Sequence, residues 1–428
     1  MSNNRGPNRV RPVTQLPRRN AQAVNRVSLS ERAENLYHLI YSQFRHQSVE
    51  FNRLLLITVF MVGFGLIMVL SSSSIDAIKA DSNAYSIFLK QVLWALLGFA
   101  GLIAASLMPH RFFSRLSVWL YGTGMIMQLA VLFTPLGIDV NGNRAWLRLP
   151  GGLSLQPSEF LKLAMILGVA KLLADREHLV DNRKLFLRPI LVQSGLAMVA
   201  VVLGKDLGTT LVMALILFLM LYIFGLPSWQ FRLPLLGAGV AVVFFLLTGP
   251  SRMARILAWI NPNSTEGQLY SWQAQHGIWA LAAGQFIGVG IGMSKLKWSW
   301  IPEVENDYIF AIIGEELGMI GALAVIGLFL LLAYSLYRIY QRCIDRFSQM
   351  VTMGFCIWML VQAMTNIAVV LQLLPVLGVP LPLFSSGGSS LIAGLAGIGV
   401  VLSFERENYK RLGGRAAVRT VAPRGSDR

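Results

Sequence analysis

The sequence predicts an all-α polytopic membrane protein with about ten transmembrane helices and both termini in the cytoplasm. Hydrophobic residues make up 55% of the 428 residues and charged residues only 14%, which is too little charge to cover a water-soluble protein of this size. Apolar runs of about 18 or more residues recur along the chain, and each can cross a bilayer as a helix. The runs are continuous rather than alternating, which argues against a membrane β-barrel.

Charge and cysteine content exclude several other classes of protein. The net charge of +16 could indicate nucleic-acid binding, but the basic residues fall in particular connections, which favours a membrane protein with no nucleic-acid partner. Cys343 in a connection and Cys356 in a helix do not make a disulfide framework. The five histidines are scattered without metal-ligand spacing, so no metal site is predicted.

Residues 1–50 are predicted to form a basic cytoplasmic tail. Residues 1–27 are rich in Arg, Asn and Pro, a composition typical of disorder. Residues 28–31, Ser-Leu-Ser-Glu, resemble a capping box that opens a short amphipathic helix. This helix lies either on the membrane surface or in water, and the sequence leaves both alternatives open. The first apolar run begins near Leu54, so no cleavable signal peptide is expected.

The transmembrane domain is predicted to cover residues 51–405, with a basic cytoplasmic tail at residues 406–428. Its expected spans are 54–74, 86–107, 113–135, 158–174, 187–203, 207–225, 232–249, 308–337, 349–371 and 388–404. Lys and Arg concentrate in both tails and after even-numbered spans, which places both termini in the cytoplasm and requires an even number of spans. The outer connection 250–307, between spans seven and eight, is rich in Trp, Gly and mixed charge. Its glycines permit a re-entrant backbone, and we expect chemistry there.

Polar residues cluster at the predicted outer ends of the spans. The first cluster runs from Asn141 to Trp146 and resumes at Gln156 to Glu159. Ser158 suits a helix N-cap, which explains part of this pattern as a turn and a helix start. It does not explain Lys162, one turn into a span, because a charge inside a membrane is usually paired or functional.

Two further clusters are acidic. Asp206 precedes the sixth span and is equally well interpreted as a helix cap or as a substrate or ion-pair residue. Glu303, Glu305 and Asp307 alternate before the eighth span, where mutual repulsion could raise the pKa of one carboxyl toward that of a general base. Local sequence alone favours Asp307 as an N-cap, where a helix dipole stabilises the ionised form. Glu315 and its neighbour lie within the span and must find partners in the bundle interior.

The fourth cluster, Ser385 to Ser390, opens the tenth span with two glycines flanked by serines. Backbone N–H groups at such a helix start can bind an anion, although a membrane-embedded tight turn explains the same residues. Asn366, inside the ninth span, needs an interhelical partner under either interpretation. Together the outer ends of the spans suit a substrate with an anionic head and an apolar tail.

These clusters, in this order, resemble the SEDS family (shape, elongation, division and sporulation) over about residues 54–404. The resemblance rests on Asn141–Trp146 with Gln156–Glu159, Asp206–Thr209, Asp307–Phe310 with Gly314–Gly318, and Leu381-Pro382 with Ser385–Ser390. Met68–Ser74 and the basic N-terminal tail resemble FtsW-type septal members, and the RodA-type branch usually has Tyr at the position of Ser386. The chain departs from the pattern where Glu305-Asn306 replaces a common His-Thr and where Lys205 replaces a common Pro.

The resemblance implies a peptidoglycan glycosyltransferase that polymerises lipid II at the outer face of the inner membrane, at the division septum. It implies a class B penicillin-binding protein and other division-machinery membrane proteins as partners. Asp307 matches the aspartate regarded as essential in the family, which favours a catalytic base over a cap. The expected substrate-binding residues are Arg144, Gln156, Glu159, Lys162, Asp206, Arg252, Lys297, Glu303, Asn366, Ser385, Ser386, Gly387, Gly388 and Ser389.

Arg144, Lys162, Arg252 and Lys297 are the cations expected to neutralise the departing pyrophosphate. A divalent cation such as Mg²⁺ or Mn²⁺ could share this task, although the sequence contains no dedicated cage for one. Three alternatives stay open: a lipid II flippase, a RodA-type elongation polymerase, and a non-catalytic scaffold of the division machinery.

Overall fold

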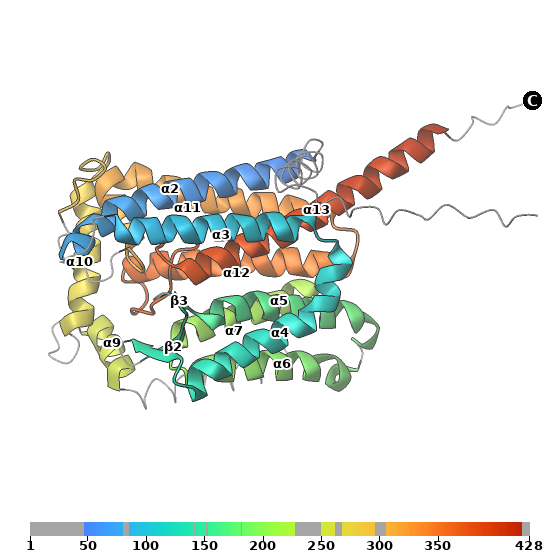
Figure 1. Ribbon diagram of the computed structural model, residues 1–428, viewed down its shortest axis with the longest axis horizontal. Helices are drawn as coiled ribbons and strands as arrows, with labels where there is room; N and C mark the ends of the chain where they lie inside the picture. The colour runs from blue at the N-terminus through green and yellow to red at the C-terminus, as the bar shows by residue number, and fades with distance from the viewer. Residues whose placement is uncertain are drawn as a thin grey trace, which may run out of the picture. The chain divides into compact units, whose positions relative to one another are not determined.

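The computed structural model describes residues 47–79, 85–140, 143–150, 153–180, 182–226, 250–261, 268–295 and 305–421. Most of them lie in long helices that run side by side (Figure 1). The helices are α2 (Val49–Lys79), α3 (Ser86–Leu107), α4 (His110–Phe133), α5 (Pro157–Asp175), η2 (Glu177–Leu179, a 3₁₀ turn), α6 (Arg183–Leu203), α7 (Leu207–Phe224), α9 (Pro250–Ile260), α10 (Gln268–Gly284), α11 (Ile309–Arg342), α12 (Arg346–Val370) and α13 (Gly388–Val421).

Eight of the described helices are long and apolar enough to cross a membrane: α2, α3, α4, α6, α7, α11, α12 and α13. They coincide with eight of the ten predicted spans, so the chain is a multi-pass membrane protein. The predicted span 158–174 corresponds to α5. This helix contains the charged residues Glu159, Lys162 and Lys171. The predicted span 232–249 lies outside the described residues. The total of ten spans and the cytoplasmic position of both termini stay predictions.

Helix α5 lies at the centre of the bundle and contacts α4, α6, α7, α12 and α13. Every residue from 161 to 170 is buried. A helix that is surrounded by other helices can carry charges that a lipid-facing helix could not, because its polar groups find protein partners. Its charged residues are therefore compatible with a position among the membrane-spanning helices.

A small antiparallel sheet joins α4 to α5, in the order β1-β2-β3. Its strands are Gly137–Val140, Asn143–Arg148 and Ser154–Leu155. A bulge between Ile138 and Asp139 shifts the register of β1 against β2. The sequence predicted only a turn and a helix start here, and the sheet corrects that prediction. It places the start of β2 and the start of α5 beside the start of α7, where the Arg144 N–H donates to the Gly204 carbonyl and Gln156 donates to Asp206.

Helix α11 is broken at Gly318, which has φ 68° and ψ −165°. The chain after α10 folds back against this break. The N–H of Val289 donates to the Glu315 carbonyl (3.0 Å), and the N–H of Met319 donates to the Gln285 carbonyl (2.8 Å). These bonds satisfy backbone groups that the break removes from the helix ladder. The close approach needs small residues, since a Cβ on Gly284 would lie 1.9 Å from the Gly314 carbonyl oxygen.

The two carboxylates inside α11 have partners, as the sequence predicts. Glu315 accepts hydrogen bonds from the Ser294 hydroxyl and from the N–H of Lys295 (2.9 Å). The Ser71 hydroxyl donates one hydrogen bond shared between the two carboxylate oxygens of Glu316, at 2.6 and 2.7 Å. The segment of α11 before the break is thus tied both to the connection that precedes it and to α2, which fixes the residues at its start.

Candidate functional site

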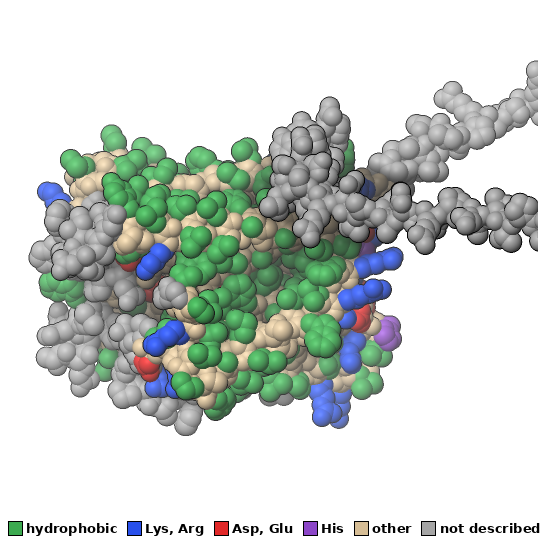
Figure 2. Space-filling view, in the orientation of Figure 1, with side chains coloured by type: hydrophobic (Ala, Val, Ile, Leu, Met, Phe, Trp, Pro, Cys, Tyr) green, Lys and Arg blue, Asp and Glu red, His purple; other side chains and the backbone are tan. Residues whose placement is uncertain are grey.

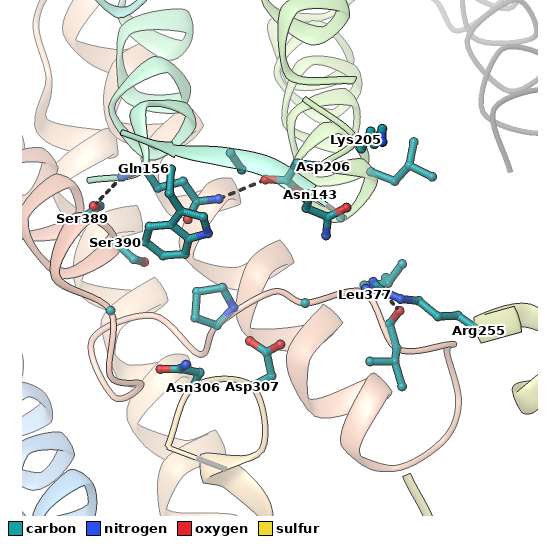
Figure 3. Close-up of a pocket in the computed structure, with 18 of the residues that line it drawn as sticks. Asn143, Gln156, Lys205, Asp206, Arg255, Asn306, Asp307, Leu377, Ser389 and Ser390 are labelled. Atoms are coloured by element: carbon teal, nitrogen blue, oxygen red, sulfur yellow. Dashed lines mark hydrogen bonds between the residues drawn. The ribbon is translucent and has the colours of Figure 1, made fainter. Parts of the chain in front are cut away.

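A pocket of about 230 Å³ lies where the starts of α5, α7, α11 and α13 meet α9 and the α12–α13 connection (Figure 3). Members of all four predicted polar clusters line it: Asn143 and Trp146, Gln156, Asp206, Asn306 and Asp307, and Ser386, Gly387, Ser389 and Ser390. The clusters are far apart in the sequence. The bundle brings them together because each one precedes or begins a helix that starts at the same end.

Asp307 lies in the turn before α11 and points toward the open centre of the pocket (Figure 3). The N-cap position of α11 belongs to Tyr308, whose side chain makes no capping hydrogen bond. The local sequence therefore suggested the wrong position for the cap. Beside the carboxylate, Gly378 has φ +68°, and a Cβ there would lie 3.7 Å from Asp307 Oδ2. A glycine at this point permits the left-handed turn that brings the α12–α13 connection against Asp307.

Asn366 holds the backbone at Asp307. Its Nδ2 donates to the carbonyl oxygens of Asp307 and Val379, both at 2.8 Å. One turn earlier on α12, Gln362 Nε2 donates to the Pro380 carbonyl at 3.0 Å. Both amides are buried. Helix α12 therefore fixes two parts of the pocket at once, the residue that carries the carboxylate and the backbone of the facing connection. Asn366 itself does not line the pocket.

Lys162 and Glu159 form an ion pair beneath the pocket (2.9 Å), with each side chain only 1% exposed. Lys162 Nζ also donates to Gln362 Oε1 at 2.7 Å and lies 5.0 Å from the centre of the Trp358 ring. A buried charge needs such partners, because desolvation costs several kcal/mol per ion. Neither residue lines the pocket. Their connection to it is through Gln362 and the Pro380 carbonyl.

The wall opposite Asp307 is a chain of hydrogen bonds that joins three helix starts (Figure 3). The Gln156 N–H donates to Ser389 Oγ (2.8 Å), and its Nε2 donates to Asp206 Oδ2 (3.0 Å). Asp206 Oδ1 accepts from the Thr209 N–H at 3.0 Å, so Asp206 caps α7 and faces the pocket as well. Desolvation raises the pKa of Asp206, while the Thr209 hydrogen bonds and the charge of Lys162 lower it.

The run from Ser385 to Ser389 divides into pocket residues and turn residues. Ser386, Gly387 and Ser389 line the pocket. The Ser386 N–H donates to the Glu305 carbonyl (2.8 Å) and the Gly387 N–H to Gln91 Oε1 (3.3 Å). Protein acceptors thus occupy these two N–H groups, and the tight-turn alternative describes the geometry better than an open anion site.

Ser385 and Gly388 hold this turn in place. Ser385 Oγ accepts from the Leu381 N–H at 2.8 Å. A Cβ on Gly388 would lie 2.5 Å from the Trp94 ring, so α13 can start against α3 only with a glycine there. Neither residue lines the pocket.

Among the described residues, the cations that line the pocket are not the ones that the sequence predicted. Arg144 does not line the pocket, and its guanidinium donates to the carbonyls of Val131 (2.8 Å) and Thr134 (2.6 Å) at the end of α4. Arg252 lies in the first turn of α9, but its side chain is outside the described part of the structure, as are Lys297 and Glu303. Within the described lining, the cations are Lys205 and Arg255.

Arg255 and the part of the α12–α13 connection from 375 to 380 were not predicted from the sequence as site residues. Arg255 Nη1 donates to the Val376 carbonyl (3.4 Å), and Trp259, one turn later, donates to the Gln372 carbonyl (2.8 Å). Helix α9 thereby closes one side of the pocket. The helical spacing of Arg252 and Arg255 was a signal that could have placed both on one amphipathic helix. The connection contributes mainly backbone and apolar side chains, which carry no chemical signature in sequence.

The arrangement offers two carboxylates, two cations and several amide and hydroxyl groups in one pocket. Among the described residues, no group of three or more His, Cys, Asp or Glu is arranged to hold a metal ion. Asp206 and Asp307 would need oxygen ligands from water or from substrate phosphates to bind Mg²⁺. The chemistry that the protein groups themselves supply is proton acceptance by a carboxylate and stabilisation of an anion by a guanidinium.

Comparison with known proteins identifies the family. The pattern of the cell cycle protein family that includes FtsW, RodA and SpoVE matches residues 52–410. The chain is 37% identical over 356 residues to a probable peptidoglycan glycosyltransferase FtsW of Mycobacterium tuberculosis, a match that covers 83% of this chain and 68% of that protein. A protein of the same description from Trichlorobacter lovleyi is 32% identical over 354 residues, covering 82% and 91%.

A solved structure described as "Structural coordination of polymerization and crosslinking by a peptidoglycan synthase complex" contains a similar chain. It aligns with a TM-score of 0.65 and 27% identity, over 83% of this chain and 98% of that one. The family pattern and the relatives above 30% identity agree with this match in fold. The chain therefore belongs to the SEDS family, which includes FtsW, RodA and SpoVE.

Proposed function

We propose that this protein is an FtsW-type peptidoglycan glycosyltransferase that polymerises lipid II into β-1,4-linked glycan strands during cell division. The names of its relatives support glycosyltransferase activity. The observation that carries the proposal is the position of Asp307, which points into a pocket at the end of a membrane bundle that Asp206 and Arg255 also line. A lipid-linked substrate with a polar headgroup would reach such a site from the membrane.

In this mechanism the Asp307 carboxylate takes the proton from the 4-hydroxyl of the acceptor's GlcNAc. The oxygen forms a bond to C1 of the donor's MurNAc, and the C1–O bond to the diphosphate breaks, with its electron pair leaving on undecaprenyl pyrophosphate. An α-linked donor becomes a β-linked product, so one inverting displacement suffices. The Asn366 hydrogen bond to the Asp307 carbonyl supports this role, because a base must be held within reach of the proton it accepts.

Arg255 is our candidate for the group that stabilises the departing pyrophosphate. Its guanidinium lines the same pocket as Asp307, and Arg binds phosphate oxygens in a bidentate manner. Lys205 provides a second, exposed cation at the rim. Arg252 and Lys297 stay predictions for the same task. Arg144 and Lys162 act at a distance in this scheme, since neither lines the pocket.

We further propose that the protein works in the inner membrane at the septum, with the pocket at the outer face. The expected partners are a class B penicillin-binding protein and other membrane proteins of the division machinery. A structural relative described as part of a peptidoglycan synthase complex supports the transpeptidase partner. Glycan synthesis with and without the purified transpeptidase measures whether the partner is needed for activity.

The central test is glycan polymerisation by purified protein supplied with lipid II in detergent. Asp307→Asn should lower the rate by roughly 10²–10⁴, the usual contribution of a general base. Asp175→Asn is the matched control, because it removes an exposed carboxylate at the far end of α5 and should leave the rate unchanged. Wild-type rates in the Asp307 variant would disprove the mechanism. Polymer formation in detergent, with no compartments to cross, also separates an enzyme from a flippase.

A scaffold would behave differently in cells. An Asp307→Asn protein that localises to the septum but does not support growth argues against a purely structural role. Normal growth of that strain would favour the scaffold, because a single carboxylate-to-amide change preserves the shape of the protein.

A further inference from the structure

A second pocket, of about 290 Å³, lies at the start of α4, at the opposite end of this helix from the sheet and the candidate site. The 24 residues of α4 span about 36 Å at the usual rise per residue. The lining residues come from the first turns of α4 and α12: His110, Arg111, Ser114, Arg115, Asp345 and Phe347. Figure 2 shows Lys and Arg side chains gathered at the end of the bundle where α13 leaves it. The proposed glycosyl transfer makes no use of this pocket.

Several arginines at this end of the bundle are engaged with carboxylates. The ion pairs are Arg338 with Glu50 (3.2 Å), Arg342 with Glu405 (3.1 Å), Arg346 with Glu177 (3.3 Å) and Arg411 with Glu407 (2.7 Å). They tie together the ends of α2, α11, α12, α13 and η2. These cations are therefore not available to a ligand without the loss of an existing contact.

Arg111 and Arg115 differ from these residues. Both are exposed, and neither forms an ion pair or hydrogen bond with any described residue. They are four positions apart on α4, so they lie on one face of the helix with Ser114 beside them. The other charged groups of the pocket are engaged: His110 bonds to Glu407 (2.7 Å), and Asp345 caps α12 by accepting from the N–H (2.8 Å) and hydroxyl (3.0 Å) of Ser348.

An apolar surface continues from this pocket along α4. Phe112 is 39% exposed beside the two arginines, and Val118, Trp119 and Ile126 are 64%, 74% and 67% exposed further along the helix. Such side chains on a membrane-spanning helix face lipid. A ligand that binds here thus meets cations at one end and an apolar face at the other.

We infer that this pocket binds the headgroup of an anionic membrane phospholipid, with Arg111 and Arg115 holding the phosphodiester and Ser114 donating to it. Two guanidinium groups and the Asp345 carboxylate leave one net positive charge in the lining, which matches the single negative charge of phosphatidylglycerol. A zwitterionic phosphatidylcholine headgroup brings no net charge to balance it. The acyl chains lie along the exposed face of α4.

Native mass spectrometry of the full-length protein in detergent tests this inference with phosphatidylglycerol and with phosphatidylcholine of the same acyl chains. The wild type should retain phosphatidylglycerol preferentially. Arg111→Gln with Arg115→Gln should lower its affinity for phosphatidylglycerol at least tenfold, because two charge-assisted contacts are lost. Both residues are exposed, so the fold is expected to persist, and unchanged polymerisation of lipid II verifies that.

The matched control is Lys184→Gln with Arg188→Gln. These two exposed cations have the same spacing on α6 and remove the same charge, but they lie outside the pocket. The control should change affinity less than threefold. Equal losses in both double variants would mean diffuse attraction to a basic surface and would overturn the inference, as would full binding by the Arg111 and Arg115 variant.

A final arm separates a lipid from a soluble phosphodiester. Glycerophosphoglycerol has the same headgroup without acyl chains, and at concentrations equal to the lipid it should not displace phosphatidylglycerol. Displacement at equal concentration would overturn the assignment to a membrane lipid. Replacement of both arginines by lysine should keep the preference for phosphatidylglycerol over phosphatidylcholine, because the positive charge remains.

Discussion

Asp206 and Asp307 occupy similar places in the sequence, and the structure uses them differently. Each precedes a membrane-spanning helix, and each was interpreted as either a cap or a functional carboxylate. Asp206 accepts from the Thr209 N–H and from Gln156, so it caps α7 and ties two helix starts together. Asp307 lies one residue before the N-cap of α11, and its backbone carbonyl accepts a hydrogen bond from Asn366. A shift of one residue in the helix start therefore decides whether the aspartate caps the helix, and the local sequence does not reveal that shift.

The largest expected contrast between the two residues is in reaction rate. Asp307→Asn removes the proposed base and should cost about 10²–10⁴ in kcat, or roughly 3–5 kcal/mol of transition-state stabilisation. Asp206→Asn keeps an acceptor for the Thr209 N–H and should cost about tenfold or less. Initial rates of glycan synthesis by the two purified variants measure the difference. Equal losses of rate in the two variants would contradict the assignment of Asp307 as the base and Asp206 as a structural residue of the pocket.

The next contrast concerns the hydrogen bond from Asn366 to the Asp307 carbonyl, which holds the backbone at Asp307. Asn366→Leu keeps the branched shape and the number of side-chain heavy atoms but removes the hydrogen bonds to the Asp307 and Val379 carbonyls. We expect kcat to fall by about tenfold with little change in KM, because the base is displaced while substrate contacts persist. A wild-type kcat in the Asn366→Leu variant would be incompatible with a positioning role for Asn366.

Gln349→Leu is the control for that substitution. Gln349 also lies on α12 and donates its amide to a carbonyl, that of Cys343 at 3.0 Å, but at the far end of the helix. The loss of this bond should lower stability by about 1 kcal/mol and leave kcat unchanged. A fall in kcat equal to that of Asn366→Leu would mean that any lost contact of α12 impairs the enzyme.

The sequence predicts those features of the fold that depend on one-dimensional patterns. Apolar runs locate the described spans, since the thickness of a bilayer sets their length. Gly284 marks a close helix contact, and Glu315 finds partners as a buried carboxylate must. The sheet was missed because strand pairing between β1 and β2 depends on which short segments meet in space, and β2 alone resembles a turn.

The site shows the same limit. Sequence identified the helix starts that surround the pocket, but it could not distinguish a guanidinium that faces a substrate from one that closes a helix end. Arg144 was expected at the substrate and instead satisfies two carbonyls of α4. Arg255 was overlooked because only the packing of α9 against the α12–α13 connection brings it to the pocket. Lys162 was recognised as requiring a partner, and Glu159 provides one.

A smaller contrast between the two aspartates is expected in stability. Asp206→Ala removes the cap of α7 and should lower the free energy of unfolding by about 0.5–2 kcal/mol. Asp307→Ala removes no cap and should lower it less. Thermal unfolding of both variants in the same detergent measures the order. A larger loss from Asp307→Ala would show that its carboxylate, rather than that of Asp206, holds the helix starts together.

The smallest effect is the pH dependence of stability that Asp206 causes. Desolvation raises its pKa above the ordinary value of 3.8, so between that value and the folded-state pKa the folded protein binds more protons than the unfolded chain. Stability from this group is complete below 3.8 and declines as pH rises through the folded-state pKa. Asp206→Asn, which cannot titrate, should therefore flatten the pH profile of the unfolding temperature above pH 4. An unchanged slope would mean that Asp206 is well solvated in the pocket, and the hydrogen bond from Gln156 would then have to compete with water.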